Sequence, residues 1–189
     1  MCLNALSELA GHNPVYYNGD IVLKDSRVDN FRSLLIKDTN GFRLPTREEH
    51  EMAARWKEDT ETTDGSILVG GRYWTPGNHP SGSPTSWEDF GTTGEYAWFI
   101  VNATDMQPVK TRLPNHLGLY DMSGNVSQWT TTKIYNEVFD DYFVILMSAA
   151  YDQQPHDTAV GARGDTRIDV ASFTIGFRIA QSMGISDSE

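Results

Sequence analysis

The chain has 189 residues, a formal net charge of −11 at pH 7, 39% hydrophobic residues and one cysteine. This length supports one domain with a packed core, and the single Cys2 excludes a framework of internal disulfides. The acidic balance argues against binding to nucleic acid or to an anionic membrane surface, because both need clustered basic residues. No apolar run approaches the roughly 18 residues of a membrane-spanning helix, so membrane insertion is not expected.

The first 22 residues predict a short helix and a β-hairpin. Apolar side chains at positions 2, 5, 6 and 9 repeat with helical spacing, which predicts a buried stripe that includes Cys2 and a helix that ends at Gly11. Asn18 and Gly19 then lie between alternating apolar residues, which is the strongest short-range signal for a hairpin turn.

A second helix is predicted after a short extended piece at residues 41–45. Thr46 and Glu49 have the spacing of a capping box, in which each side chain bonds the other residue's backbone N–H. The expected buried face of this helix consists of Met52, Ala53 and Trp56.

The middle of the chain, residues 57–105, shows no helical period and is rich in Gly, Ser, Thr and Pro, so a loop-dominated region is predicted there. Short strands are predicted at residues 95–100, 142–147 and 173–180. Two helices followed by short, scattered strands indicate an α+β domain.

Three segments carry a resemblance to a known family. Residues 41–55 read G-F-R-L-P-T-R-E-E-H-E-M-A-A-R, residues 113–129 read L-P-N-H-L-G-L-Y-D-M-S-G-N-V-S-Q-W, and residues 175–179 read I-G-F-R-I. In the same order, they are similar to G-[FY]-R-L-P-T-E-A-E-W-E-x-A-A-R, to P-N-x-[FL]-G-L-Y-D-M-x-G-N-V-W-E-W and to the terminal G-F-R strand of the formylglycine-generating enzyme, or sulfatase-modifying factor, family.

The resemblance implies an α+β, C-type-lectin-like fold of the sulfatase-modifying-factor type, irregular and with short strands and two helices. It implies a single domain over residues 1–181, followed by a flexible tail at residues 182–189. The family domain normally begins with further strands, so we expect that its N-terminal part is missing here or is supplied by another segment.

One departure from the family concerns its catalytic cysteines. Residues 147–151 align with the family's R-G-G-S-W, and the family's enzymes carry just beyond this motif two cysteines that bind copper and activate oxygen. Here residues 152–157 read D-Q-Q-P-H-D and include no cysteine. Because Cu(I) and oxygen chemistry of this type needs thiolate ligands, we expect no catalytic residues and a non-catalytic member of the family. An enzyme with an altered active site and a structural accessory domain are the alternatives.

A second departure concerns calcium. In the family the G-N-V-W-E-W loop commonly binds Ca²⁺ through the Asn side chain, a backbone carbonyl and the Glu. The corresponding residues here are Asn125, Val126 and Gln128. Gln128 offers a carbonyl oxygen but no charge, so at most a weak calcium site is predicted, and no other cofactor is expected.

The segment from Ser127 to Ser172 departs most from the family, and this suggests a divergent ligand-binding surface. Some bacterial and phage proteins of this fold have a C-terminal surface diversified by retroelements, and the chain resembles such a variable protein. The expected partner is an unidentified protein or other macromolecule, and the relatives suggest a location on a cell surface or a virion. The predicted ligand-binding residues, which mix aromatic and polar side chains, are Ser127, Trp129, Tyr135, Tyr151, Asp152, Gln153, His156, Asp157, Arg163, Asp165 and Arg167.

Three acidic residues, Glu137, Asp140 and Asp141, are interpreted as a solvated loop. A catalytic role is the weaker interpretation, because nothing nearby in the sequence would raise the pKa of one carboxyl group selectively.

Overall fold

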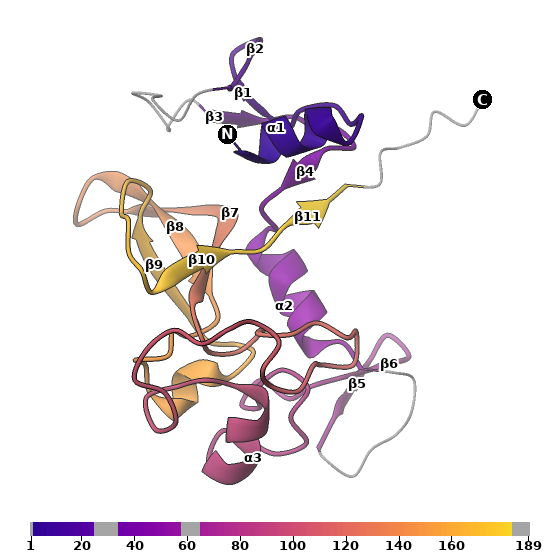
Figure 1. The fold of residues 1–189 in the computed structure, drawn as a ribbon, viewed down its shortest axis with the longest axis vertical. Helices are drawn as coiled ribbons and strands as arrows, with labels where there is room; N and C mark the ends of the chain where they lie inside the picture. The colour runs from indigo at the N-terminus through magenta and orange to yellow at the C-terminus, as the bar shows by residue number, and fades with distance from the viewer. Residues whose placement is uncertain (1, 25–33, 58–64, 183–189) are drawn as a thin grey trace. The chain divides into compact units, whose positions relative to one another are not determined.

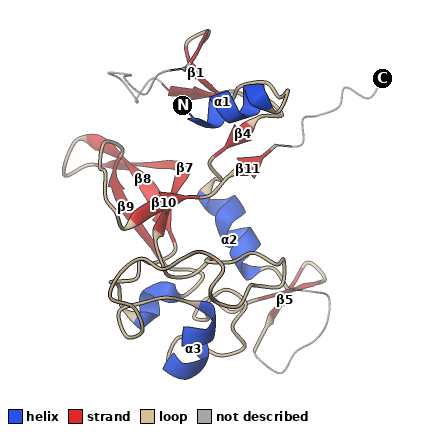
Figure 2. Cartoon of the chain, in the orientation of Figure 1, coloured by secondary structure: helices blue, strands red, loops and turns tan. Residues whose placement is uncertain are grey.

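The structure is a computed structural model that describes residues 2–24, 34–57 and 65–182 (Figures 1 and 2). The chain divides into two compact units, one made of residues 1–45 and 178–189 and the other of residues 46–177. Of the predicted tail, residues 183–189 lie outside the described residues. The mixture of helices with short strands confirms the predicted α+β class, although the described residues form three α-helices instead of the two that were predicted.

The first unit combines one helix with short strands. Its elements are α1 (Cys2–Leu9), β1 (Tyr16–Asn18), β2 (Ile21–Val22), β3 (Leu34–Ile36), β4 (Phe42–Arg43) and β11 (Ala180–Gln181). The predicted hairpin is present as β1 and β2, but Asn18 belongs to the strand and pairs with Ile21, so that Gly19 and Asp20 form the turn. Gly19 takes a positive φ of 58°, which is the conformation that favours glycine.

Helix α1 ends as predicted, because Gly11 has a φ of 76° and donates to Glu8 while His12 donates to Ser7. The predicted buried stripe is wrong. Leu9 is 87% exposed, whereas the buried positions are Leu3, Asn4 and Ser7. The side chain of Cys2 lies outside the described residues.

Hydrogen bonding explains why polar residues of α1 face the core. Asn4 donates to the carbonyls of Tyr16 and Leu23 and accepts from the backbone N–H groups of Val15 and Tyr16. The Ser7 hydroxyl accepts from the backbone N–H of Phe42. Buried backbone groups of short strands need such partners, and this need determines which face of α1 is buried.

The second unit holds the longer strands. Its elements are α2 (Arg47–Arg55), β5 (Ile67–Val69), β6 (Arg72–Trp74), α3 (Phe90–Tyr96), β7 (Ser127–Asn136), β8 (Asp141–Met147), the 3₁₀-helix η2 (Pro155–Thr158), β9 (Arg163–Arg167) and β10 (Ile175–Phe177). The main sheet has the order β10-β7-β8-β9, in which β10 runs parallel to β7 and the other pairs are antiparallel. The strands predicted at residues 142–147 and 173–180 correspond to β8 and to β10 with β11.

Helix α2 begins with the predicted capping box. The Thr46 hydroxyl accepts from the backbone N–H of Glu49 at 3.1 Å, and the Glu49 carboxylate accepts from that of Thr46 at 2.8 Å. The predicted buried face is correct only in part: Ala53 and Trp56 are half-buried, but Met52 is exposed and the fully buried positions are His50 and Ala54. Ala54 packs in a small core cluster with Met122 and Val160, while His50 bonds to the main sheet.

The strand predicted at residues 95–100 is wrong: helix α3 covers its first two residues, and the rest of the segment pairs only through the isolated bridge between Trp98 and Gly124. The helix contains two glycines and two threonines, which are poor helix formers, so its residues show little helical propensity. Asp89 caps its N-terminus by accepting from the backbone N–H and the hydroxyl of Thr92, and Thr93 is completely buried. Capping and burial therefore outweigh the intrinsic preference of these residues.

Candidate functional site

The second family-like motif forms a loop that positions the start of β7. Asn115 joins three parts of the second unit: its Nδ2 donates to the carbonyl of Ala53 and to the hydroxyl of Ser81, and its Oδ1 accepts from the backbone of Leu117 and Leu119. Gly124 pairs with Trp98 in an isolated parallel bridge and has a φ of 76°. The loop is thus held by a buried amide and a close backbone contact.

Asn125, the first of the predicted calcium ligands, follows Gly124 with a φ of 66°. Its Oδ1 accepts from the backbone N–H of Gln107, its Nδ2 donates to the Gln107 carbonyl, and its own carbonyl accepts from the N–H of Tyr151. Asn125 thereby connects the loop before β7 with the loop after β8. Calcium at Asn125, Val126 and Gln128 stays a prediction, and an ion bound there would have to displace hydrogen bonds of this kind.

Gln128, the second residue of β7, is buried against α2. Its side-chain oxygen lies 3.0 Å from Nε2 of His50, and its Nε2 donates to the carbonyl of Asp121 at 2.7 Å. Gln128 thus joins α2, β7 and the preceding loop.

The loop that takes the place of the family's cysteines follows β8. Tyr151 is buried, and this burial, with the nearby Asp105 and Asp152 carboxylates, raises its pKa above the usual value. Gln153 accepts through its side chain from the backbone N–H of Ala150 and through its carbonyl from that of Ile100. These contacts are structural ones within the second unit.

The rest of this loop includes η2. The Asp157 carboxylate accepts from the backbone N–H of Gln154, and it also lies 3.5 Å from Nε2 of His156. The His156 ring is exposed and meets the edge of Trp87 at a centroid distance of 5.9 Å. Asp152 is exposed at the start of the loop.

These residues do not fit the copper that the family's enzymes bind. The loop from 152 to 157 presents carboxylates, amides and one imidazole, and no thiolate. Among the residues that the structure describes, no group of three or more His, Cys, Asp or Glu side chains is arranged to hold a metal ion. The soft donor pair that Cu(I) prefers is therefore not provided by this loop.

Strand β9 places three predicted residues on one face of the main sheet. Arg163, Asp165 and Arg167 lie directly opposite Met147, Ile145 and Phe143 of β8. Since neighbours in an antiparallel pair share a face and alternate residues point the same way, the three charges line one side of this edge strand. All three are exposed. Arg167 forms an ion pair with Asp169 at 3.2 Å.

The remaining predicted residues lie elsewhere. Trp129 is half-buried opposite Leu146, on the other face of the sheet from the β9 charges, and Ser127 and Tyr151 are buried. Tyr135 pairs with Tyr142, which lies one residue along β8 from Phe143, the partner of Arg167, and five residues from the position of Arg163. The exposed predicted residues with acidic or basic side chains on β9 and in the loop before it are grouped as what we call the charged strip, defined as Asp152, His156, Arg163, Asp165 and Arg167.

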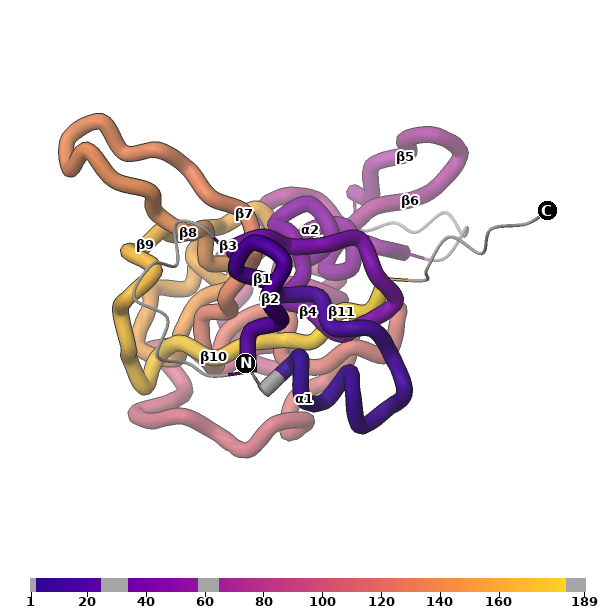
Figure 3. Tube along the Cα trace, turned by 90° about the horizontal axis from the view of Figure 1, so that it is seen from above, coloured from indigo at the N-terminus to yellow at the C-terminus, as the bar shows by residue number. Residues whose placement is uncertain are grey.

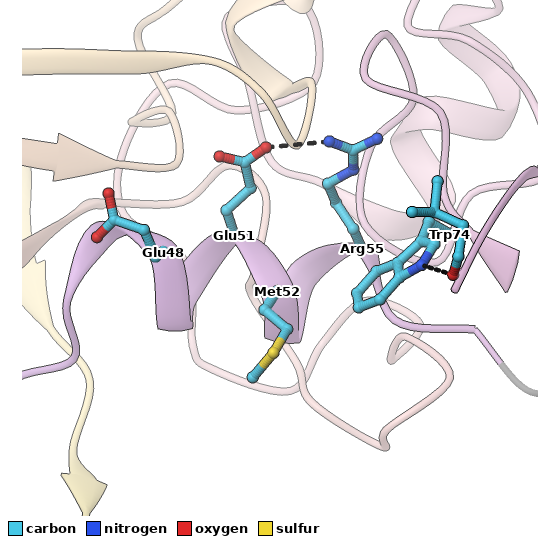
Figure 4. A pocket seen from close by; sticks show the side chains of 6 residues that line it. Glu48, Glu51, Met52, Arg55 and Trp74 are labelled. Carbon is cyan, nitrogen blue, oxygen red and sulfur yellow. Dashed lines mark hydrogen bonds and ion pairs between the residues drawn. The ribbon is translucent and has the colours of Figure 1, made fainter. Parts of the chain in front are cut away.

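An open groove along α2 was not predicted from the sequence. Its volume is about 310 Å³, and it is lined by Glu48, Glu51, Met52, Arg55, Val69 and Trp74 (Figure 4). Glu51 is paired with Arg55 at 3.1 Å, and the Trp74 indole donates to the carbonyl of Val69. The exposed Met52 could have indicated such a groove only if the orientation of α2 had been known. The groove suits a ligand in which an apolar group lies beside a positive charge.

Within the described residues, no helix combines the length and the apolar character that crossing a membrane requires.

Comparison with known proteins gives one family and several relatives. The profile described as "Sulfatase-modifying factor enzyme 1-like domain" matches residues 6–183. The chain is 32% identical over 155 residues to the inactive C-alpha-formylglycine-generating enzyme 2 of Mus musculus, covering 76% of this chain and 44% of that protein. It is 35% identical over 97 residues to the chaperone protein LppX of Paenibacillus barcinonensis, covering 48% of this chain and 31% of that protein. The chain spans less than half of the length of these curated relatives.

Two solved structures share the fold. The variable protein 1 of Treponema denticola matches with a TM-score of 0.69 and 24% identity, over 95% of this chain and 66% of that one. CarF matches with a TM-score of 0.64 and 24% identity, over 95% of this chain and 62% of that one. These similarities confirm the predicted fold, the sulfatase-modifying-factor type of the C-type-lectin-like fold.

Proposed function

The chain belongs to the sulfatase-modifying factor enzyme 1-like family, and we propose that it is a non-catalytic, ligand-binding member of that family. The proposal is supported by the loop at residues 152–157, where the family's enzymes carry the thiolates for copper and this chain has none. It is also supported by the mouse relative, which is itself named an inactive enzyme.

The observation that carries the binding role is the charged strip. The side chains of Asp152, Arg163 and Asp165 are exposed and form no hydrogen bond or ion pair within the described residues, whereas those of Gln153 and Asp157 hold the backbone of their own loop. Charges that stabilise nothing inside the fold are free to meet complementary groups of a ligand. Their alternation of sign along one strand favours a protein, whose surface can offer both signs at matching spacing.

A more specific proposal is that a retroelement diversifies the side chains of the strip. The fold is shared with a variable protein of Treponema denticola, and the segment that departs from the family pattern contains the strip. Diversification can change only side chains whose replacement does not disturb the core. We therefore expect variation at the exposed positions of the strip and constancy at buried neighbours such as Tyr151 and Met147.

Sequencing the gene from independent isolates tests this more specific proposal. Codons of the strip should vary, and an adenine-rich near-repeat of this region should lie beside a reverse transcriptase gene. Variation spread equally over strip and core codons would contradict diversification and leave the simpler binding role in place.

Binding itself can be tested without a known ligand. A phage-displayed library of small repeat proteins with randomised surfaces is selected against the intact chain, and the affinity of each selected binder is then measured for R163A/D165A/R167A. We expect most binders to lose at least about tenfold in affinity, the loss typical of removing central interface residues.

The matched control is R72A/E88A/K110A, which removes two basic residues and one acidic residue from exposed positions elsewhere in the same unit. Binders should lose less than about twofold against it, since these charges lie outside the strip. Because Arg72 and Lys110 lie over the rings of Trp56 and Tyr120, thermal unfolding establishes that the control variant is folded before affinities are compared. If the binders bind the strip variant as well as the unchanged protein, the proposed surface is wrong.

An enzyme with an altered active site is the rival function. Oxygen consumption in the presence of Cu(I) and a thiol reductant should not exceed that of the heat-denatured chain. Catalysed consumption that depends on the loop at residues 152–157 would favour the rival.

A further inference from the structure

The hairpin formed by β7 and β8 changes from buried to exposed along its length. Residues 144–147 of β8 are buried on both faces of the sheet and belong to the core of the second unit. Toward the turn, Phe143 is half-buried and Tyr142 is exposed. We define residues 134–143 as the hairpin tip, and Figure 3 shows its turn extending away from the rest of the second unit.

The tip exposes large apolar side chains at high fractions. Val138 is 86% exposed, Phe139 65%, Tyr135 51% and Tyr142 50%. Isolated exposed apolar residues are ordinary on protein surfaces, but a contiguous group marks an interaction site. Here the group is contiguous in sequence, and ring contacts join four of its side chains in two pairs.

Two ring pairs lie on the two faces of the hairpin. The Tyr135 and Tyr142 rings meet edge to face at a centroid distance of 5.3 Å, and the Phe139 and Phe143 rings lie 5.5 Å apart. Tyr142 and Phe143 are successive residues of β8 and so point to opposite sides. A partner that covers this tip therefore has to surround it on both sides, as a hollow does and a flat surface does not.

The turn is held in one conformation by its own polar groups. The Asn136 side chain accepts from the backbone N–H groups of Val138 and Phe139, and the Tyr135 hydroxyl bonds the Asp140 carboxylate. Asp140 takes a φ of 48°. A preorganised turn loses little conformational entropy when it binds, which is the property of rigid aromatic anchors in recognition surfaces.

The charge at the tip is acidic. Glu137, Asp140 and Asp141 lie within it, Lys133 lies just before it, and Arg167, which forms an ion pair with Asp169, lies opposite Phe143. The three carboxylates share the tip with the apolar side chains, and the chain as a whole carries a formal charge of −11. A partner with acidic residues around its contact surface would be repelled, whereas one with lysine or arginine residues would be attracted.

We propose that the hairpin tip docks into an apolar hollow of a partner protein whose rim carries lysine and arginine. The inference does not rest on the proposed function: although Arg167 of the charged strip pairs with Phe143 of the tip, the proposal is carried by the apolar side chains nearer the turn, such as Val138 and Phe139. A second copy of this chain does not offer such a hollow in its groove along α2, since Glu48 and Glu51 line that groove and Glu51 already pairs with Arg55.

The test uses the repeat-protein library selected against the intact chain. Each binder is measured against V138S/F139S, which removes apolar surface from side chains that make no hydrogen bond. We expect a class of binders that loses at least about tenfold in affinity, carries an apolar concave surface and is enriched in lysine and arginine at its edge. Binding of this class should weaken as salt rises.

A matched control is available in the same unit. Val109 and Phe173 are 72% and 70% exposed and lie outside the tip. V109S/F173S makes the same two replacements at comparable exposure, and the tip-dependent binders should lose less than about twofold against it. Circular dichroism and thermal unfolding of both variants establish that each is folded before affinities are compared.

Three results would overturn the proposal. The first is a selection in which no binder distinguishes V138S/F139S from the control variant, and the second is a set of tip-dependent binders without basic enrichment. The third is a different partner for the tip, seen as sedimentation with neutral phosphatidylcholine vesicles or as self-association in light scattering that V138S/F139S abolishes. R163A/D165A/R167A and V138S/F139S are measured separately. A result against the proposal for the tip can therefore be distinguished from a result against the proposal for the charged strip.

Discussion

Nε2 of His50 lies 3.0 Å from the side-chain oxygen of Gln128, and this bond joins α2 to β7 in the interior of the second unit. His50 is 2% exposed and Gln128 is 4% exposed. In the family patterns these two positions read Trp and Glu. The two departures therefore meet in space, although they are 78 residues apart in sequence, and together they form a hydrogen-bonded pair.

Replacing Gln128 with leucine should lower the free energy of unfolding by about 2–3 kcal/mol, because the carbonyl of Asp121 and the His50 ring each lose a buried partner. Urea unfolding followed by tryptophan fluorescence measures this change. A double-mutant cycle with His50→Leu should give a coupling of about 1 kcal/mol. Strictly additive effects of the two substitutions would mean that the pair is not an energetic unit.

Replacing Gln128 with glutamate should strengthen calcium binding by about tenfold or more, because a carboxylate supplies the charge that a hard cation prefers. Isothermal titration calorimetry with CaCl₂ compares the variant with the unchanged protein. The isosteric replacement keeps the size of the side chain, so a change in affinity reports the charge. Equal affinities would show that residue 128 does not contact the ion.

Two glycines with the same backbone conformation should respond differently to alanine. Gly124 and Gly118 have φ values of 76° and 73°, but a Cβ on Gly124 would collide with the backbone of Trp98, whereas one on Gly118 would meet nothing within 4 Å. We expect Gly124→Ala to cost about 3 kcal/mol or more and Gly118→Ala about 1 kcal/mol. Equal losses in chemical denaturation would mean that the contact with Trp98 contributes nothing.

The cap of α3 should make stability depend on pH. Hydrogen bonds from Thr92 hold the pKa of Asp89 below its ordinary value of 3.8. A carboxyl group with a lowered pKa in the folded state stabilises the fold above its unfolded pKa and loses this effect as the pH falls through the folded value. The melting temperature of Asp89→Ala should therefore lie below that of the unchanged protein at neutral pH, and the gap should close below pH 3.8.

Asp89→Ser is the control for this experiment, since serine can still cap the helix but carries no charge. Asp89→Ser should lower the melting temperature less than Asp89→Ala does at neutral pH. Because serine has no carboxylate, the melting temperature of this variant should lack the acid-dependent stabilisation by Asp89. If the gap between Asp89→Ala and the unchanged protein stays constant through the acid range, the carboxylate does not stabilise the helix.

Local spacing in the sequence determined the features that depend on a few neighbouring residues. The capping box of Thr46 and Glu49, the helix end at Gly11 and the hairpin near Gly19 all follow from contacts within one turn. The absence of cysteine from residues 152–157 is likewise a property of the sequence alone. Such features require no knowledge of distant partners.

The tertiary structure decided which faces are buried and where the predicted ligand residues lie. Asn4 and His50 are buried because distant backbone and side-chain groups need them as hydrogen-bond partners, and no helical period encodes that need. The β7–β8 register, with its irregularity between Trp129 and Lys133, places Trp129 and Arg163 on opposite faces of one sheet. Pairing between strands sets this register, and spacing along one strand does not determine it.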